Sequence, residues 1–162
     1  MTFPKLLIIG LDSAAPALVF DRWRNELPTL AGLIARGAHG RMHSTHPPIT
    51  VPAWTAMMSS RDPGELGFYG FRNRKDHSYD AYSFANSAQV KVPRLWDWLG
   101  EAGRTSIVLG VPQTYPPSPI HGEMVTCFLT PSTQSQYTYP AELKAEVERL
   151  RKEFPDRLVM AS

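Results

Sequence analysis

Runs of apolar residues divide the chain into segments that predict alternating strands and helices. One continuous apolar run follows Lys5, reaches Leu11 and ends in Asp12, and a second run spans Thr105 to Leu109. Uninterrupted apolar runs of this length are typical of strands buried on both faces of a parallel sheet. We therefore expect the two runs to lie side by side in one sheet, with Asp12 at the carboxyl edge of its strand.

Apolar positions at helical spacing occupy the intervals around these strands. The expected helices cover residues 16–23, 28–36, 50–58, 93–102 and 140–154, and shorter strands are expected at 41–44 and 123–129. Residues 59–92 are rich in Gly, Tyr, Asn and Ser without sustained periodicity, which predicts a long loop with room for one hairpin. Loops of this length inside a compact domain are often functional.

The alternation predicts an α/β fold, with three α/β/α layers around a mostly parallel sheet. Functional sites in such folds lie at the carboxyl ends of the strands, where Asp12 is expected. The second half of the chain supplies only two convincing strands, and the sequence stops eight residues after its last expected helix at 140–154. We therefore expect a domain that is incomplete at its C-terminus.

Composition narrows the possible partners. The chain has 162 residues, 43% of them hydrophobic, and a formal net charge of +2 with scattered basic residues. This favours one globular domain and gives no indication of a nucleic-acid partner. The single cysteine, Cys127, favours a reducing compartment, so the cytoplasm is the expected location. No segment approaches the roughly 18 apolar residues of a membrane span.

Thr50 and Asp12 are the candidates for chemistry. Thr50 begins the segment Thr50–Met58, where it would be the N-cap of a helix and where the positive end of the helix dipole favours an anion such as phosphate. A threonine in this place is also an ordinary structural N-cap. Asp12 is either a ligand for a divalent metal or a cap for the following turn. Metal-assisted phosphoryl transfer would require the carboxylate and the hydroxyl to converge on one ion.

The order of several motifs resembles one family. The matching stretches are residues 9–14, 27–30, 37–38, 47–55 (Pro-Pro-Ile-Thr-Val-Pro-Ala-Trp-Thr), 62–64, 95–97, 111–116 and 129–131. Together they resemble the type I phosphodiesterase and nucleotide pyrophosphatase branch of the alkaline phosphatase superfamily, in its predicted phosphohydrolase subgroup. The segment around Thr50 is specific, whereas Gly-Leu-Asp or Asp-Pro-Gly alone is a weak signal.

The resemblance implies a metal-dependent hydrolase of phosphate monoesters or diesters. In the enzymes that the chain resembles, two divalent ions, commonly zinc with manganese as an alternative, lie at the carboxyl edge of an alkaline phosphatase-like sheet. Asp12 matches a ligand of one ion, and Thr50 matches the nucleophile, which also contacts the metal. The family's remaining Asp and His ligands come later in the chain, and their motifs are not found here. Residues 1–162 therefore match the N-terminal portion of the catalytic domain.

Five positions depart from the family pattern. Ser13 and Ser60 stand where the family usually has glycine, Ser59 stands where it has threonine, and Leu66 replaces a histidine. Phe71 falls where nucleotide-cleaving members place an asparagine that contacts phosphate. A nucleotide substrate is therefore in doubt, and the expected substrate is a small phosphate ester. The five histidines, which show no metal-ligand spacing, are interpreted as solvated or packing residues: His39, His43, His46, His77 and His121. His43 and His46 are near enough to Thr50 in sequence for one to be considered as a proton shuttle.

The sequence also bears on three alternatives to a phosphate ester hydrolase. A sulfatase would share the fold but needs a modified Cys or Ser, and Thr50 is neither. A transferase of phosphate-bearing headgroups would use the same site. From another class, the chain would be a truncated, non-catalytic fragment that self-associates or needs a C-terminal half.

Overall fold

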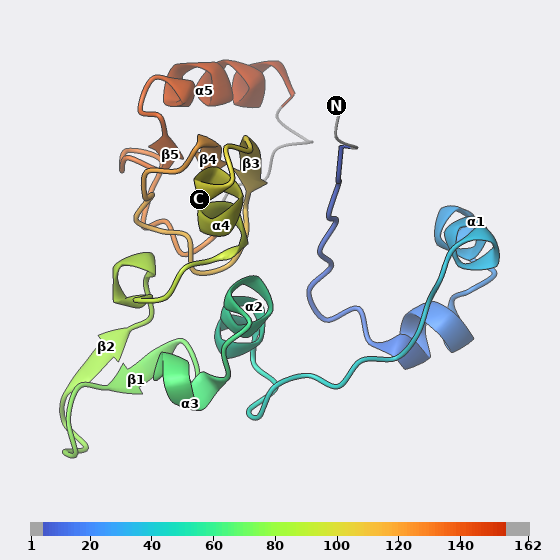
Figure 1. Ribbon diagram of the computed structural model, residues 1–162, viewed down its shortest axis with the longest axis horizontal. Coiled ribbons are helices and arrows are strands. Elements are labelled where there is room, and N and C mark those ends of the chain that lie inside the picture. The colour runs from blue at the N-terminus through green and yellow to red at the C-terminus, as the bar shows by residue number, and fades with distance from the viewer. Residues whose placement is uncertain (1–4, 155–162) are drawn as a thin grey trace. The chain divides into compact units, whose positions relative to one another are not determined.

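The computed structural model describes residues 5–154, and the chain divides into two units, Met1–His43 and Ser44–Ser162. The first unit contains η1 (Ala17–Arg22) and α1 (Pro28–Arg36). The helices of the second unit are α2 (Thr50–Ser59), α3 (Pro63–Leu66), η2 (Ser87–Gln89), α4 (Leu95–Glu101) and α5 (Leu143–Glu153). Its strands are β1 (Arg72–Arg74), β2 (Tyr82–Phe84), β3 (Ser106–Leu109), β4 (Gly122–Val125) and β5 (Thr138–Tyr139) (Figure 1).

The described residues form a mixed α/β structure with two sheets. The strands β3 and β4 pair in parallel, as expected for a crossover connection, and β5 adds to β4 in the antiparallel direction. The hairpin of β1 and β2 forms the second sheet, which confirms the hairpin expected within 59–92. The rest of this stretch is not all loop as expected, because α3 and η2 also lie in it. The strand β5 was not predicted, because two residues are too few to show a periodicity.

Helices cover one face of the β3–β4–β5 sheet. Val108 and Met124 are register partners in β3 and β4, and both pack with Met58 of α2 and Trp96 of α4. Alternation along β3 sends Ile107 and Leu109 to the opposite face, where they are 68% and 65% exposed. Among residues 5–154, helix packing is therefore found on one face of this sheet, and the predicted covering of both faces is not confirmed.

The predicted strand at residues 5–11 is wrong, because the structure assigns no strand to this apolar run. Its large side chains are exposed, from 81% for Leu6 to 55% for Ile8. A buried parallel strand needs neighbouring strands for its backbone and helices for both faces, and within residues 5–154 no strand pairs with this segment. Apolar composition indicates that burial is favourable, but it does not supply the partner.

Two smaller predictions are also wrong. Residues 41–44 form no strand. Asp12 lies in a turn with Ser13, not at the end of a strand. Most other segments match their expected type, with boundaries that shift by a few residues as helix ends usually do. No helix among residues 5–154 has the length and apolar character needed to cross a membrane.

Candidate functional site

The start of α2 positions Thr50. Ile49 has extended backbone angles and its carbonyl accepts the N–H of Ala53 at 3.0 Å, so Ile49 is the N-cap and Thr50 is the first helical residue. This corrects the prediction that Thr50 itself is the N-cap. Thr50 is half-buried. Its place in the first turn keeps it at the end of the helix where the dipole favours an anion.

The loop before Thr50 folds around one carbonyl. The hydroxyl of Thr45 donates to the oxygen of Pro47 at 2.9 Å, and the N–H of Ile49 donates to the same oxygen at 3.0 Å. The His46–Pro47 peptide bond is cis. These contacts fix the path of the chain into α2, so the specific Pro-Pro-Ile-Thr segment has a structural role in orienting the helix start.

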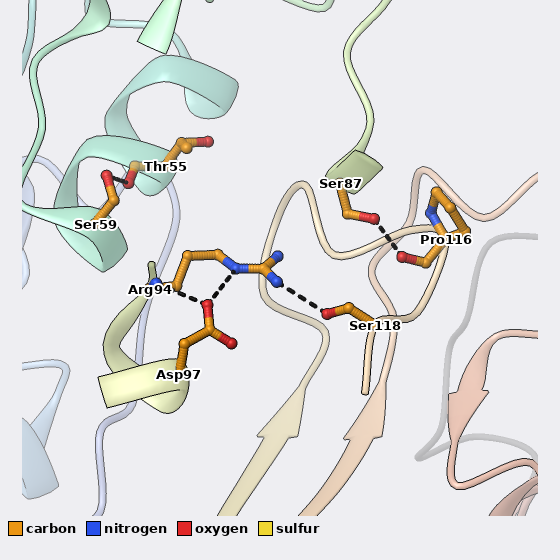
Figure 2. Close-up of polar contacts among 7 residues, drawn as sticks. All are labelled: Thr55, Ser59, Ser87, Arg94, Asp97, Pro116 and Ser118. Carbon is orange, nitrogen blue, oxygen red and sulfur yellow. Dashed lines mark hydrogen bonds and ion pairs between the residues drawn. The ribbon is translucent and has the colours of Figure 1, made fainter. Parts of the chain in front are cut away.

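Buried polar contacts hold α2 in the second unit. The hydroxyl of Thr55 lies 2.7 Å from the carbonyl oxygen of Val51 and 2.5 Å from Oε1 of Gln113, and both Thr55 and Gln113 are buried. Ser59 donates to the carbonyl of Thr55 at 2.7 Å (Figure 2). The amide of Gln113 also donates to the carbonyl of Asn86 at 3.3 Å. Because these groups are buried, their hydrogen bonds fix α2 against the loop that follows β3.

The same loop is tied to α4 and η2. Arg94, which is 8% exposed, places Nε 3.3 Å from Oδ2 of Asp97 and donates from Nη2 to Ser118 at 2.9 Å (Figure 2). The hydroxyl of Ser87 donates to the carbonyl of Pro116 (Figure 2). Sequence reasoning identified residues 111–116 only as a motif. The structure shows that this motif braces the carboxyl side of β3.

Two other motif residues accept hydrogen bonds from backbone N–H groups at the starts of helices. Asp62 accepts hydrogen bonds from the N–H groups of Gly64 and Glu65 at 2.7 and 3.0 Å and thereby caps α3. Asp97 accepts from the N–H of Arg94 at 2.8 Å at the start of α4. Both carboxylates therefore have a structural role. This role explains the aspartates of the Asp-Pro-Gly and Leu-Trp-Asp motifs without making them metal ligands.

The serines that replace family glycines have left-handed backbones. Ser13 has φ +59° and Ser60, the C-cap of α2, has φ +55°. Glycine adopts this region without the steric cost that other residues meet. The backbone geometry at both positions would favour glycine, and the serines here keep that geometry.

Asp12 and Thr50 belong to different units, Met1–His43 and Ser44–Ser162. The convergence of the two side chains on one ion stays a prediction. Among residues 5–154, no group of three or more His, Cys, Asp or Glu side chains could hold a metal ion. His39 contacts the ring of Phe20, with centroids 5.6 Å apart, as expected for a packing residue.

Comparison with known proteins identifies the family. The sequence model of type I phosphodiesterase / nucleotide pyrophosphatase matches residues 6–160. No curated protein and no solved structure matches the chain. The family match spans nearly the whole chain and includes Asp12, Thr50 and all the motifs described above. The chain belongs to the type I phosphodiesterase / nucleotide pyrophosphatase family.

Proposed function

We propose that the chain is the N-terminal portion of a phosphate ester hydrolase in which Thr50 is the nucleophile. The observation that carries the proposal is the position of Thr50 at the first residue of α2, inside the specific motif of a family whose model spans residues 6–160. A helix start favours the phosphate group. The bracing of α2 by Thr55 and Gln113 holds that end in place.

In the proposed reaction, Oγ of Thr50 attacks phosphorus and the bond from phosphorus to the alcohol oxygen breaks. The leaving alcohol takes the bonding electrons, the proton of the threonine hydroxyl passes to solvent or a base, and a phospho-threonine remains. Water then attacks phosphorus and releases Thr50 with a second proton transfer. The substrate is a phosphate monoester or diester, and the same covalent intermediate would serve a transferase.

Repeated turnover in the proposed reaction depends on two divalent ions, zinc or manganese. The carboxylate of Asp12 and the hydroxyl of Thr50 are hard oxygen donors that suit such ions. They do not fit a two-metal site by themselves, because two ions need about six or seven protein ligands and residues 5–154 contain no cluster of three candidate ligands. We propose that the two ions need further ligands besides Asp12 and Thr50, in an α/β/α domain with a mostly parallel sheet.

A labelling experiment tests the nucleophile. The 162-residue chain is incubated with zinc and bis(p-nitrophenyl) phosphate, and peptides are analysed by mass spectrometry. The proposal predicts a phosphoryl adduct on Thr50 that is absent in Thr50→Ala and weaker in Asp12→Asn. Thr45→Ala, which removes a neighbouring hydroxyl, should keep the adduct. Equal labelling of several hydroxyls, or none on Thr50, would refute the proposal.

A further inference from the structure

Two half-exposed phenylalanine rings, from Phe71 and Phe128, lie against each other. The rings of Phe71 and Phe128 lie with centroids 6.2 Å apart at an interplanar angle of 57°, and the side chains are 40% and 49% exposed. Phe71 precedes β1, and Phe128 follows the carboxyl end of β4. An exposed pair of phenylalanine rings from distant parts of the chain leaves apolar surface in water, which a ligand could cover.

Packing contacts tie the segments that carry the two rings to the residues next to Thr50. Val51, the residue after Thr50, is fully buried in a cluster with Phe68 and Ala85, and Leu129 packs against the same cluster. Phe68 and Leu129 are close in sequence to the two rings, at 71 and 128. Both segments that carry the rings are therefore anchored on the first turn of α2.

Gly70 brings the hairpin root against the N-cap residue. A β-carbon at Gly70 would lie 3.9 Å from Cδ1 of Ile49, which immediately precedes Thr50 and is 37% exposed. Asn73 fixes this root by accepting the N–H of Tyr69 at 2.9 Å and donating to the carbonyl of Gly70 at 3.0 Å. Ile49 thus adds a third partly exposed apolar side chain on the hairpin side of the helix start.

We infer that Phe71 and Phe128 form an apolar platform for the alcohol part of the phosphate ester, so that the substrate class is esters of aromatic or other apolar alcohols. The inference rests on the proposed function, because Thr50 must receive the phosphate. Phosphate at the start of α2 would leave the organic group to cover the two rings. Phe71 and Phe128 would then be specificity-determining residues, whose loss changes substrate preference and leaves the attacking group intact.

Binding of two phosphonates to the whole 162-residue chain tests the platform. Phenylphosphonate and methylphosphonate carry the same anionic group and differ in their apolar part, so the ratio of their dissociation constants isolates the platform. We expect phenylphosphonate to bind about tenfold more tightly, as burial of one ring predicts. Phe71→Ala and Phe128→Ala should each reduce that ratio to about threefold or less. Phe71→Leu, which keeps apolar volume, should reduce it less.

The control is Phe84→Ala, since Phe84 is 71% exposed on β2 and should leave the ratio unchanged. Circular dichroism melting confirms that each variant is folded. Equal binding of both phosphonates, with Thr50 still labelled by bis(p-nitrophenyl) phosphate, would overturn the platform alone. Absence of binding by either phosphonate together with absence of labelling would overturn the proposed function and the platform with it. An equal loss of ratio in Phe84→Ala would also contradict the platform.

Discussion

The two units of the chain differ in what their apolar residues achieve. Within residues 5–43, no residue is buried, and the apolar run 6–11 is exposed. The second unit has two buried clusters, one around Met124 and one around Val51. The sequences of both units contain strong apolar patterns. Apolar residues therefore stabilise the fold only where other parts of the chain pack against them. Substitutions in matched pairs, one in each unit, can test this difference.

The largest difference is expected for glycine substitutions. A β-carbon on Gly122, which has φ +143°, would lie 1.9 Å from the carbonyl oxygen of Ser106 in the paired strand β3. Gly122→Ala should therefore disrupt the β3–β4 pairing and cost about 3 kcal/mol or more. Gly40→Ala meets nothing within 4 Å and should change stability by less than about 0.5 kcal/mol.

Urea unfolding followed by tryptophan fluorescence measures both, since Trp96 is buried in the second unit and Trp23 lies in the first. If Gly122→Ala unfolds at the same urea concentration as the parent, the close approach of β3 and β4 is not as described.

The next effect concerns cavities. Met124 is fully buried, so Met124→Ala should lower the free energy of unfolding by about 2–5 kcal/mol through lost burial and a cavity. Leu33 in α1 is 51% exposed, and Leu33→Ala should cost less than about 1 kcal/mol. Equal losses in the two variants, measured by the same urea titration, would show that the first unit has a core of its own.

A buried tyrosine gives the second unit a dependence on pH. Tyr137 is fully buried and its hydroxyl donates to the Glu148 carboxylate of α5, and burial together with this contact raises the pKa of Tyr137 to about 12. The hydrogen bond from Tyr137 lowers the pKa of Glu148. The raised pKa favours the folded state below the ordinary value of 10.0, and this contribution disappears as pH rises toward about 12. The lowered pKa of Glu148 stabilises the folded state above pH 4.5, the ordinary pKa of a glutamate. This stabilisation is lost as the pH falls below that value.

Tyr137→Phe should therefore cost about 1 to 2 kcal/mol near pH 7 and remove this alkaline loss of stability. Melting temperatures between pH 7 and 12 check the prediction. A variant with the same alkaline profile as the parent would exclude Tyr137 as its source.

The smallest expected effect is a gain. Ser60→Gly should raise stability by about 1 kcal/mol, because φ +55° is strained for serine and open to glycine. Ser13 has the same kind of backbone, at φ +59°, but lies in the unit whose described residues include none that are buried. Ser13→Gly should consequently leave the urea midpoint unchanged. A gain from Ser13→Gly as large as that from Ser60→Gly would show that the two units unfold together.

Local pattern predicted most elements of the second unit. Helical spacing identified α2, α4 and α5, and the apolar run 105–109 identified β3. These predictions are right because each element has packing partners within the same unit. The strand expected at 5–11 failed for the opposite reason. The short β5 could not be predicted, since its place depends on pairing with β4 and not on its own residues.

The candidate site was predicted unevenly. The motif around Thr50 located the helix start to within one residue, whereas the N-cap role of Ile49 follows from backbone angles that a sequence does not display. The contact of Gln113 with Thr55 and that of Phe71 with Phe128 each join residues more than 50 positions apart. A local sequence pattern could therefore not predict them. The sharing of one ion by Asp12 and Thr50 remains a prediction.

Turnover by the 162-residue chain distinguishes an incomplete site from a complete one. The chain is purified, supplied with zinc or manganese, and assayed with bis(p-nitrophenyl) phosphate and p-nitrophenyl phosphate. We expect each chain to release no more than one nitrophenolate, and Thr50→Ala to release none. The described residues do not provide the ligands of a second ion, which is needed to complete the cycle. Multiple turnover that disappears in Thr50→Ala would show that these 162 residues supply a complete site, and would contradict the account.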